Sequence, residues 1–354
     1  NKERKYPIYL LGEKKIEKII KNFSCLSLKN ENKIINEIID TEIIFTSVGA
    51  KNLLTLSEII AKGIKEKFKR NNSYLNIVIC ENLFYAGEKL KRAILNTGVL
   101  SEKEKEYLEE KVGFVETVIS RMTSPLKEEE KKINPLLVKV EPYKILPIDK
   151  SNFKGEIPKI KGFLPVPDLK KYEELKFYGH NLSHVCLAYY GFLKNYTYIW
   201  ECIEDEEIFK LLKNVQNEVT QSLMKKYSFK ESELEEYFLD LNKRFDNKLL
   251  EDTVSRVGRD PLRKLEKNER IVGAIKLCLE YNIFPENICF VLVTALCYNN
   301  RSDEESIKLQ EIIKKSGIDF VLIEICGIKD EKILKKVKEL YKELKNESSN
   351  FKRN

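Results

Sequence analysis

The chain has 354 residues, of which 63 are basic and 56 acidic, giving a formal net charge of +7. Its length predicts about two domains, and a hydrophobic content of 42% suffices for a sizeable core. No run of about 18 apolar residues occurs, so we expect no transmembrane helix. Lysines and acidic residues are mixed along the chain, as on a solvated, salt-bridged surface, and we expect no nucleic-acid partner. The mildly basic balance suits an anionic small substrate.

Cysteine and histidine usage bears on compartment and on metals. None of the eight cysteines is spaced as CxxC, and most lie in apolar runs, as Cys80 and Cys297 do. Free cysteines of this kind pack as small hydrophobic residues and predict a reducing, cytoplasmic compartment. The chain has only two histidines, His180 and His184, which argues against a histidine-based metal site.

Apolar runs of strand length alternate with helical patterns in the first half of the chain. Such strands, apolar on both sides and separated by amphipathic helices, predict a parallel sheet covered by helices. The expected strands are Tyr6–Leu11, Glu42–Val48, Tyr74–Cys80, Phe114–Met122 and Leu136–Val140, and the expected helices are Leu53–Lys67 and Glu88–Leu95.

The pattern changes near Glu141. Residues 141–168 hold five prolines and two glycines, which predicts an irregular connector. Beyond Asp168 helical periodicity dominates, so the second half is predicted to be all-helical. We expect its helices near residues 169–194, 205–226, 231–246, 268–281, 285–298, 303–316 and 328–345.

Lys176, Asn181 and His184 form the sharpest cluster of polar residues in the predicted helical half. In an α-helix Asn181 would lie about 140° round from Lys176, and His184 would return by about 60° toward it. A partly buried lysine can act as a general base, an asparagine amide can donate to an alkoxide, and a histidine can relay a proton. Alternatively the three are a surface cation, a loop residue and a core imidazole, and spacing alone favours this second explanation.

Two predicted strands end in groups that suit a ligand, since parallel sheets bind ligands at the carboxyl ends of their strands. Glu81 and Asn82 follow one strand, and Asn82 could supply an amide to an oxyanion. Thr46, Val48 and Gly49 end another, where glycine would let the backbone approach a cofactor. Taken alone, Asn82 could simply cap the next helix, and the residues from Thr46 to Gly49 could form a plain tight turn.

A compact basic loop is predicted between helices of the second half. It carries Arg256, Arg259, Arg263 and Lys264 within nine residues, with one glycine and one proline between them. Arginine is the fork-shaped donor suited to phosphate, so the loop is a candidate phosphate site. Salt bridges to acidic helices explain the same cations, and both explanations stay open.

Taken together, these motifs give the chain a family resemblance. It resembles the mannitol dehydrogenase family of long-chain polyol dehydrogenases, whose motifs occur here in the same order over nearly the whole chain. No single motif is decisive, but the ordered set is specific. The matching stretches are Cys80–Asn82, Gly113–Glu116, Asn152–Gly155 with Pro158, the string of Lys176, Asn181 and His184, and Arg256–Leu265.

The resemblance implies an NAD-dependent oxidoreductase without a metal, acting on a small sugar phosphate as a monomer or loose dimer. The implied reaction interconverts D-mannitol 1-phosphate and D-fructose 6-phosphate. The family's lysine base falls on Lys176, its oxyanion-holding asparagines on Asn82 and Asn181, and its histidine on His184. We further expect cofactor contacts from Thr46, Val48, Gly49 and Glu81, and substrate contacts from Arg256, Arg259, Arg263 and Lys264.

The resemblance also exposes a departure. The family opens with a strand and a glycine-rich turn that holds the cofactor pyrophosphate at a helix N-terminus, and Asn1 aligns after that turn. We therefore expect a Rossmann-type domain over residues 1–145 without its βαβ start, and a helical catalytic domain over residues 146–354. Alternatives are a related hexuronate reductase, a free-polyol dehydrogenase and a non-catalytic truncated remnant. The basic loop argues against the first two.

Overall fold

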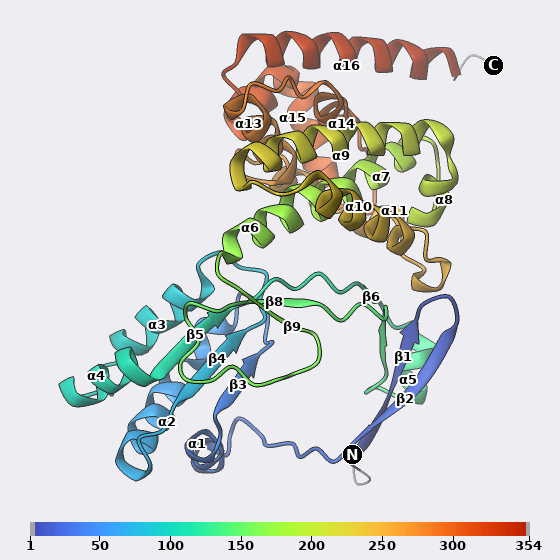
Figure 1. The fold of residues 1–354 in the computed structure, drawn as a ribbon. Coiled ribbons are helices and arrows are strands. Elements are labelled where there is room, and N and C mark those ends of the chain that lie inside the picture. Colours follow the sequence, from blue (N-terminus) through green and yellow to red (C-terminus); the bar gives the residue numbers. More distant parts are fainter. Residues whose placement is uncertain (1–3, 352–354) are drawn as a thin grey trace. The chain divides into compact units, whose positions relative to one another are not determined.

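The computed structural model describes residues 4–351 and divides into two units, each considered by itself (Figure 1). The first unit holds most of the chain up to Glu173. The second holds the chain from Glu174 onward together with the short segments Leu10–Ile16 and Thr123–Pro125. Residues 146–173, which the sequence prediction grouped with the helical half, thus pack in the first unit.

A three-stranded parallel sheet forms the centre of the first unit. Its order is β3 (Ile43–Thr46), β4 (Leu75–Ile79) and β5 (Val112–Glu116), with Ile44 opposite Ile77 and Ile77 opposite Phe114. All five residues of β4 are buried, as expected for a central strand covered on both faces. The strand predicted over Phe114–Met122 begins two residues earlier and ends at Glu116.

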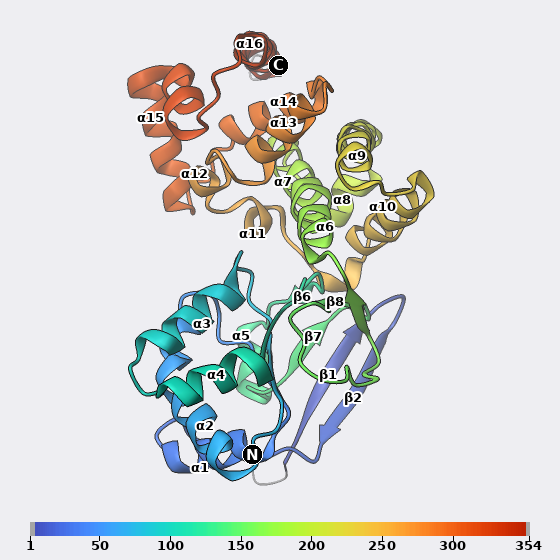
Figure 2. The same ribbon diagram turned by 60° about the vertical axis from the view of Figure 1, so that its left-hand side comes forward.

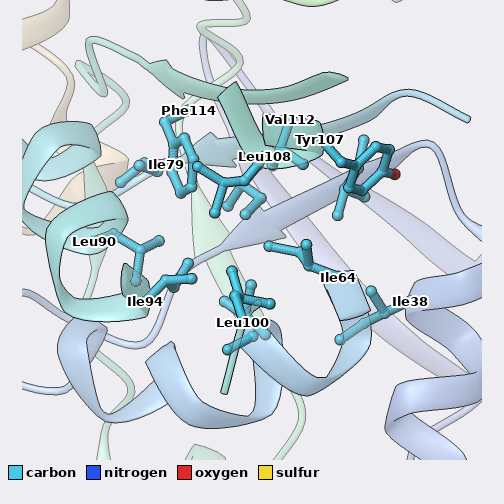
Figure 3. Packing of buried hydrophobic residues seen from close by; sticks show 14 of the residues in the cluster. Ile38, Ile64, Ile79, Leu90, Ile94, Leu100, Tyr107, Leu108, Val112 and Phe114 are labelled. Carbon is cyan, nitrogen blue, oxygen red and sulfur yellow. The ribbon is translucent and has the colours of Figure 1, made fainter. Parts of the chain in front are cut away.

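Helices pack against this sheet and supply the hydrophobic core shown in Figure 3. Ile64 of one helix, Leu90 of a second and Leu108 of a third are all fully buried in the cluster that contains Ile79 of β4. The two helices predicted in the first half are thus only part of this layer, because α1 and α4 were not predicted. The helices are α1 (Glu31–Asp40), η1 (Leu53–Leu56), α2 (Ser57–Arg70), α3 (Ala86–Asn96) and α4 (Glu102–Lys111).

Two further sheets complete the strands of the described residues. A four-stranded sheet has the order β2–β1–β7–β6, and a two-stranded parallel sheet pairs β8 with β9. The β8–β9 pair corrects the prediction of an irregular connector over 141–168. Proline is tolerated there because neither strand of a two-stranded pair is a central strand. The elements are β1 (Lys5–Leu11), β2 (Lys15–Lys21), β6 (Thr123–Ser124), α5 (Glu128–Ile133), β7 (Val138–Val140), β8 (Leu146–Asp149) and β9 (Phe163–Val166).

The second unit is helical, and α7 (Leu182–Leu193) is packed among its other helices (Figure 2). Most of α7 is buried, because it contacts α8, α9, α11 and α14. Each of the seven predicted helical regions contains a helix. The remaining elements are α6 (Leu169–Glu174), η2 (Leu175–Asn181), α8 (Ile199–Glu204), α9 (Glu206–Tyr227), α10 (Glu231–Phe245), η3 (Lys248–Leu250), α11 (Val254–Gly258), α12 (Pro261–Lys264), α13 (Arg270–Glu280), α14 (Glu286–Leu296), α15 (Glu304–Phe320), η4 (Val321–Ile325) and α16 (Glu331–Phe351).

Candidate active site

The segment that carries Lys176 and Asn181 is a π-helix, η2, inserted between α6 and α7. The expectation of a plain α-helix at this point was wrong. A π-helix is built on i→i+5 hydrogen bonds, so residues five apart lie one turn apart instead of on divergent faces. Lys176 and Asn181 are five residues apart, and the wide turn therefore brings them closer to one face than the α-helical spacing would.

Close packing accompanies this wide turn. A Cβ on Gly179 would lie 3.3 Å from the Tyr237 ring and 3.4 Å from the Phe238 ring, both on α10. On the other side, a Cβ on Gly273 of α13 would lie 2.9 Å from the ring of Tyr178. The π turn thus fits between α10 and α13 because glycine occupies both contact points.

Lys176 is half-buried on this turn, and Asn181 is half-buried one turn further on. Across the residues that the structure describes, the carboxamide of Asn181 makes no hydrogen bond. A half-buried amide without an internal acceptor can donate to a ligand oxygen. The pair therefore offers an amine and an amide donor from one helical turn.

His184 lies on α7, in the turn that follows the π-helix, and its ring is held on two sides. Its Nε2 lies 3.0 Å from Oδ2 of Asp252. Its plane stacks on Phe245, with ring centroids 4.8 Å apart and an interplanar angle of 28°. The imidazole is thus fixed in both position and tilt. A partnered, stacked ring of this kind also fits the core imidazole that spacing alone allowed.

Asp252 joins His184 to the basic loop, and the sequence prediction missed it. Its Oδ1 accepts a hydrogen bond of 2.8 Å from Nε of Arg256, and Asp252 as a whole is only 8% exposed. Burial acts to raise the pKa of Asp252, but the interactions with His184 and Arg256 outweigh it and lower the pKa below its ordinary value. The one signal in the sequence was an acidic residue four positions before the first arginine of the loop.

The other histidine, His180, lies inside the helical unit and differs from His184. Its side chain is buried, and its Nδ1 has no hydrogen-bond partner within the described part of the chain. Burial, followed by the positive charge of Arg244, holds its pKa well below the usual range. His180 is therefore a neutral imidazole packed edge-on against Phe245, with ring centroids 5.5 Å apart.

The four cations of the basic loop occupy different environments. Arg256 is turned inward to Asp252, with a shortest separation of 2.6 Å. Arg259 keeps 64% of its side chain exposed, and Arg263 donates to Glu269 at 3.1 Å. A shallow cavity of about 460 Å³ opens beside Arg256 and Arg259. Its other lining residues are Ser255, Asp260, Asn300, Ser302, Asp303, Glu304 and Glu305.

Lys264, the last cation of the loop, points into the protein. Its side chain is buried, and its ammonium donates to the carbonyl oxygens of Val257, at 2.7 Å, and Arg259. Burial, together with the charges of Arg270 and Arg263, lowers the pKa of Lys264 to about 7. Lys264 thus holds the C-terminal end of α11 and the turn that follows it.

The groups predicted to contact a cofactor form a hydrogen-bonded cluster in the first unit. Glu81 follows β4 and reaches back to the end of β3, where its carboxylate accepts from the Thr46 hydroxyl at 2.6 Å and from the Val48 N–H at 2.9 Å. Thr46 and Glu81 are buried. Gly49 has φ +82°, and a Cβ there would meet no atom within 4 Å. The turn after β3 is therefore fixed by Glu81, while open space adjoins its backbone at Gly49.

Asn82 begins the loop that leads from β4 into α3. That loop ends at Tyr85, whose φ of +57° is left-handed. The first turn of α3 is bound by Glu116 at the end of β5, whose carboxylate accepts from the N–H of Gly87 at 2.7 Å. Burial raises the pKa of Glu116. Asn82 thus lies in the loop after β4, and Glu116 fixes the helical end of that loop.

No helix within residues 4–351 is long and apolar enough to cross a membrane. In the same part of the chain, the His, Cys, Asp and Glu side chains nowhere gather in a group of three or more that could hold a metal ion.

A parallel sheet with helices on its faces, followed by a helical unit with a lysine and an amide on one turn, defines a two-domain dehydrogenase of the Rossmann type. Comparison with known proteins narrows this class. Residues 1–162 match the mannitol dehydrogenase Rossmann domain, and residues 168–346 match the mannitol dehydrogenase C-terminal domain. The chain therefore belongs to the mannitol dehydrogenase family, and the predicted family, fold class and oxidoreductase class are confirmed.

Individual proteins agree with this assignment. The mannitol-1-phosphate 5-dehydrogenase of Clostridium acetobutylicum is 35% identical over 98% of this chain and 90% of its own. A D-sorbitol dehydrogenase solved in substrate-free form has a TM-score of 0.81 at 16% identity, covering 98% of this chain and 83% of its own. The mannitol 2-dehydrogenase of Pseudomonas fluorescens, solved with NAD and D-mannitol, has a TM-score of 0.73 at 16% identity, covering 99% and 82%. These two structures share the fold.

Proposed function

We propose that this chain is an NAD-dependent dehydrogenase that interconverts D-mannitol 1-phosphate and D-fructose 6-phosphate. The observation that carries the proposal is the π turn with Lys176 and Asn181 on it, followed by a fixed His184. The relative that is 35% identical over 98% of the chain and bears the name of this activity supports the choice of substrate. The basic loop supports a phosphorylated rather than a free polyol.

In the oxidative direction, Lys176 in its neutral form takes the proton of the reacting hydroxyl group. The amide of Asn181 donates a hydrogen bond to the oxygen on which negative charge develops, as in an oxyanion hole. We assign Asn82 as a second amide donor to that oxygen. In the reductive direction the same groups act in reverse, and the ammonium of Lys176 returns the proton to the oxygen.

The groups at the carboxyl edge of the parallel sheet suit the cofactor. The turn after β3 has a glycine at positive φ with open space beside it, so a ligand can approach the backbone closely. Bound NAD supplies the acceptor for the hydride that leaves the substrate carbon. Thr46, Val48 and Gly49 would line this part of the cofactor site, and Glu81 would fix their geometry through its two hydrogen bonds.

The substrate phosphate is assigned to the outward-facing part of the basic loop. Arg259 is the most exposed of the three arginines and borders the cavity of about 460 Å³. A guanidinium group can bind phosphate through two parallel hydrogen bonds. Arg256 borders the same cavity and is oriented by Asp252, whereas Arg263 is bonded to Glu269. Lys264 holds the loop backbone with its ammonium, so we assign it to shaping this site.

The test is an NADH absorbance assay with D-fructose 6-phosphate, with D-fructose and a hexuronate as competing substrates. Lys176→Ala should cut kcat by about three orders of magnitude, because general base catalysis and charge stabilisation are lost together. Lys213→Ala, which removes an exposed lysine from α9, serves as the matched control and should keep wild-type kcat. Turnover of D-fructose or of the hexuronate in preference to the phosphate would support another member of the family. Turnover of none of them would support a non-catalytic remnant.

A further inference from the structure

Asp252 accepts hydrogen bonds from two functional side chains with its two separate oxygens. Oδ2 lies 3.0 Å from Nε2 of His184 on α7, and Oδ1 lies 2.8 Å from Nε of Arg256 on α11. With 8% exposure, the carboxylate has little contact with water that could replace either partner. One carboxylate thus links the candidate proton-relay group to the candidate substrate-binding arginine.

The backbone around Asp252 is fixed independently of its side chain. Its carbonyl oxygen accepts from the N–H of Ile199 at 2.9 Å, and Thr253 pairs with Tyr198 in an isolated antiparallel bridge. The hydroxyl of Thr253 then caps α11 by accepting from the N–H of Arg256 at 3.3 Å. The carboxylate is therefore delivered from a rigid position. It is not a mobile surface group that happens to meet a histidine.

The hydrogen bond to Asp252 also determines which histidine tautomer is present. An ionised carboxylate only accepts, so Nε2 of His184 must carry the proton when the ring is neutral. Nδ1 is then left as an acceptor, able to take a proton from an amine or a hydroxyl group. Because the ring is also stacked on Phe245, neither its tautomer nor its tilt needs to change during the reaction.

We propose that Asp252 is a positioning residue of the dehydrogenase reaction, which holds His184 in its Nε2–H tautomer and holds Arg256 in a fixed orientation toward the substrate. This role rests on the proposed function. A carboxylate that accepts a hydrogen bond from one ring nitrogen fixes the orientation and tautomer of a functional histidine, as it does for metal-bound histidines. Asp252 itself touches no reacting atom.

The charged and titratable groups near this pair come from the π turn, α10, α11 and α13. Arg256 of α11 is bonded to Asp252, and the ring of His180 on the π turn lies 5.8 Å from that of His184. The charges of Arg244 on α10, Lys176 on the π turn and Arg270 on α13 act on His180. Among the residues that the structure describes, the carboxylate of Asp252 is the anionic group that pairs with the imidazole of His184, at 3.0 Å. Replacing it with an amide removes that negative charge while keeping a side chain of nearly the same shape.

The first experiment measures the tautomer directly. The chain has only two histidines, so selective ¹⁵N labelling of histidine in untagged protein gives ring signals from His180 and His184 alone. His180→Gln assigns them. In the wild type we expect His184 to have a protonated Nε2 and an unprotonated Nδ1, whereas in Asp252→Asn the tautomers should mix. A wild-type His184 with the proton on Nδ1 would overturn the proposal whatever the substrate is.

The second experiment measures catalysis. Asp252→Asn should lower kcat by about 10- to 100-fold. It should also raise KM for D-fructose 6-phosphate through Arg256 and shift the pH profile of kcat/KM, with KM for NADH unchanged. Asp252→Glu should restore part of kcat, because it keeps the negative charge. Unchanged kinetics in Asp252→Asn, with Lys176→Ala still inactive, would overturn the role of Asp252 and leave the proposed function intact.

A matched control separates this role from a general loss of stability. Glu218 is another buried carboxylate of the helical unit, which accepts hydrogen bonds from Asn287 and Ile288 at the start of α14. Glu218→Gln removes a buried charge in the same way, but none of its partners belongs to the candidate site. It should lower the melting temperature while keeping the wild-type pH profile and the wild-type tautomer of His184. If Glu218→Gln altered the pH profile and the tautomer as Asp252→Asn does, a general loss of structure would explain the effects of both variants.

Discussion

Asp252 remains ionised although its carboxylate is buried, because both oxygens accept from donors that can carry positive charge. Burial on its own would raise the pKa of the group, but the hydrogen bonds and charges of His184 and Arg256 bring it below the ordinary value of 3.8. A carboxyl group with a lower pKa in the folded than in the unfolded chain stabilises the fold above its unfolded pKa. That contribution is lost as the pH falls through the folded pKa.

Asp252→Asn should therefore destabilise the protein in a pH-dependent manner. At about pH 7 the free energy of unfolding should fall by about 2 kcal/mol, since hydrogen bonds to a charged group are lost. The difference between variant and wild type should shrink as the pH falls below about 4, where the wild-type carboxylate also becomes protonated. Urea denaturation of both proteins across this range measures it. A difference that stays constant down to about pH 3 would mean that the charge of Asp252 contributes nothing.

In the basic loop, the sequence does not distinguish cations that can bind phosphate from cations that are bonded inside the protein. Its four cations were predicted together as substrate contacts, because arginine and lysine near a glycine and a proline all suit phosphate. In the folded chain Arg256 is bonded to a buried carboxylate, Arg259 is open, and Lys264 donates to backbone carbonyls. Which cation turns inward depends on Asp252 and on the loop's own carbonyls. These partners are set by the packing of α11 and α12, and a local pattern of charges does not reveal them.

At the scale of elements, the parallel strands and longest helices followed directly from the sequence. Continuous apolar runs can be buried only in a covered sheet, which made β3 and β4 predictable. The helices α1 and α4 were missed, although Ser101 and Glu104 form a capping box before α4. The strand pair β8–β9 was also missed, because its prolines were interpreted as signs of irregular structure.

The π turn η2 could not have been predicted, because apolar spacing does not distinguish i→i+5 from i→i+4 hydrogen bonding over seven residues. Its existence depends on tertiary packing of Tyr178 against Gly273 and of Gly179 against α10. Lys176 and Asn181 were predicted to lie on one helix, and they do. The prediction assumed α-helical spacing, however, whereas the chain forms a π-helix there. Asp252, the partner of His184, lies 68 residues further along the chain, and no local pattern joins the two.

Gly273→Ala tests whether the π turn matters for catalysis. The new Cβ would lie 2.9 Å from Cε1 and 3.0 Å from the hydroxyl oxygen of Tyr178, so the ring must move. Overpacking of this kind should lower the free energy of unfolding by about 1–3 kcal/mol. Because Tyr178 lies between Lys176 and Asn181 on the turn, kcat of the folded variant should also fall, as steady-state kinetics and thermal unfolding would measure.

Gly63→Ala provides the comparison for this variant. It creates a similar clash in the first unit, where its Cβ would lie 2.6 Å from Cγ2 of Ile38, and it should lower stability without changing kcat. Adding Tyr178→Ala to Gly273→Ala removes the clashing ring and should restore part of the lost stability. Equal loss of kcat in Gly63→Ala and Gly273→Ala would indicate that the π turn has no special part in the reaction.

At the scale of the whole molecule, the proposal assigns cofactor and substrate phosphate to different units of the chain. Glu81 belongs to the first unit and Arg259 to the second. A ligand that binds only the folded protein raises its stability by an amount set by its concentration and dissociation constant, about 2.7 kcal/mol at 100 times that constant. Thermal unfolding with each ligand therefore reports on each assignment separately.

Two variants should separate the two binding events. In Glu81→Ala the turn at Thr46 and Val48 loses its hydrogen bonds, so the melting-temperature increase caused by NADH should largely disappear. In Arg259→Ala that increase should persist, while the further increase on adding D-fructose 6-phosphate should be lost, because the phosphate loses its exposed guanidinium group. The exposed residues Glu110 and Arg301 provide matched alanine controls, one in each unit, which should respond as the wild type does. If both Glu81→Ala and Arg259→Ala lost both responses equally, cofactor and phosphate could not be assigned to separate units. Arg259 would then act on the fold rather than on the substrate.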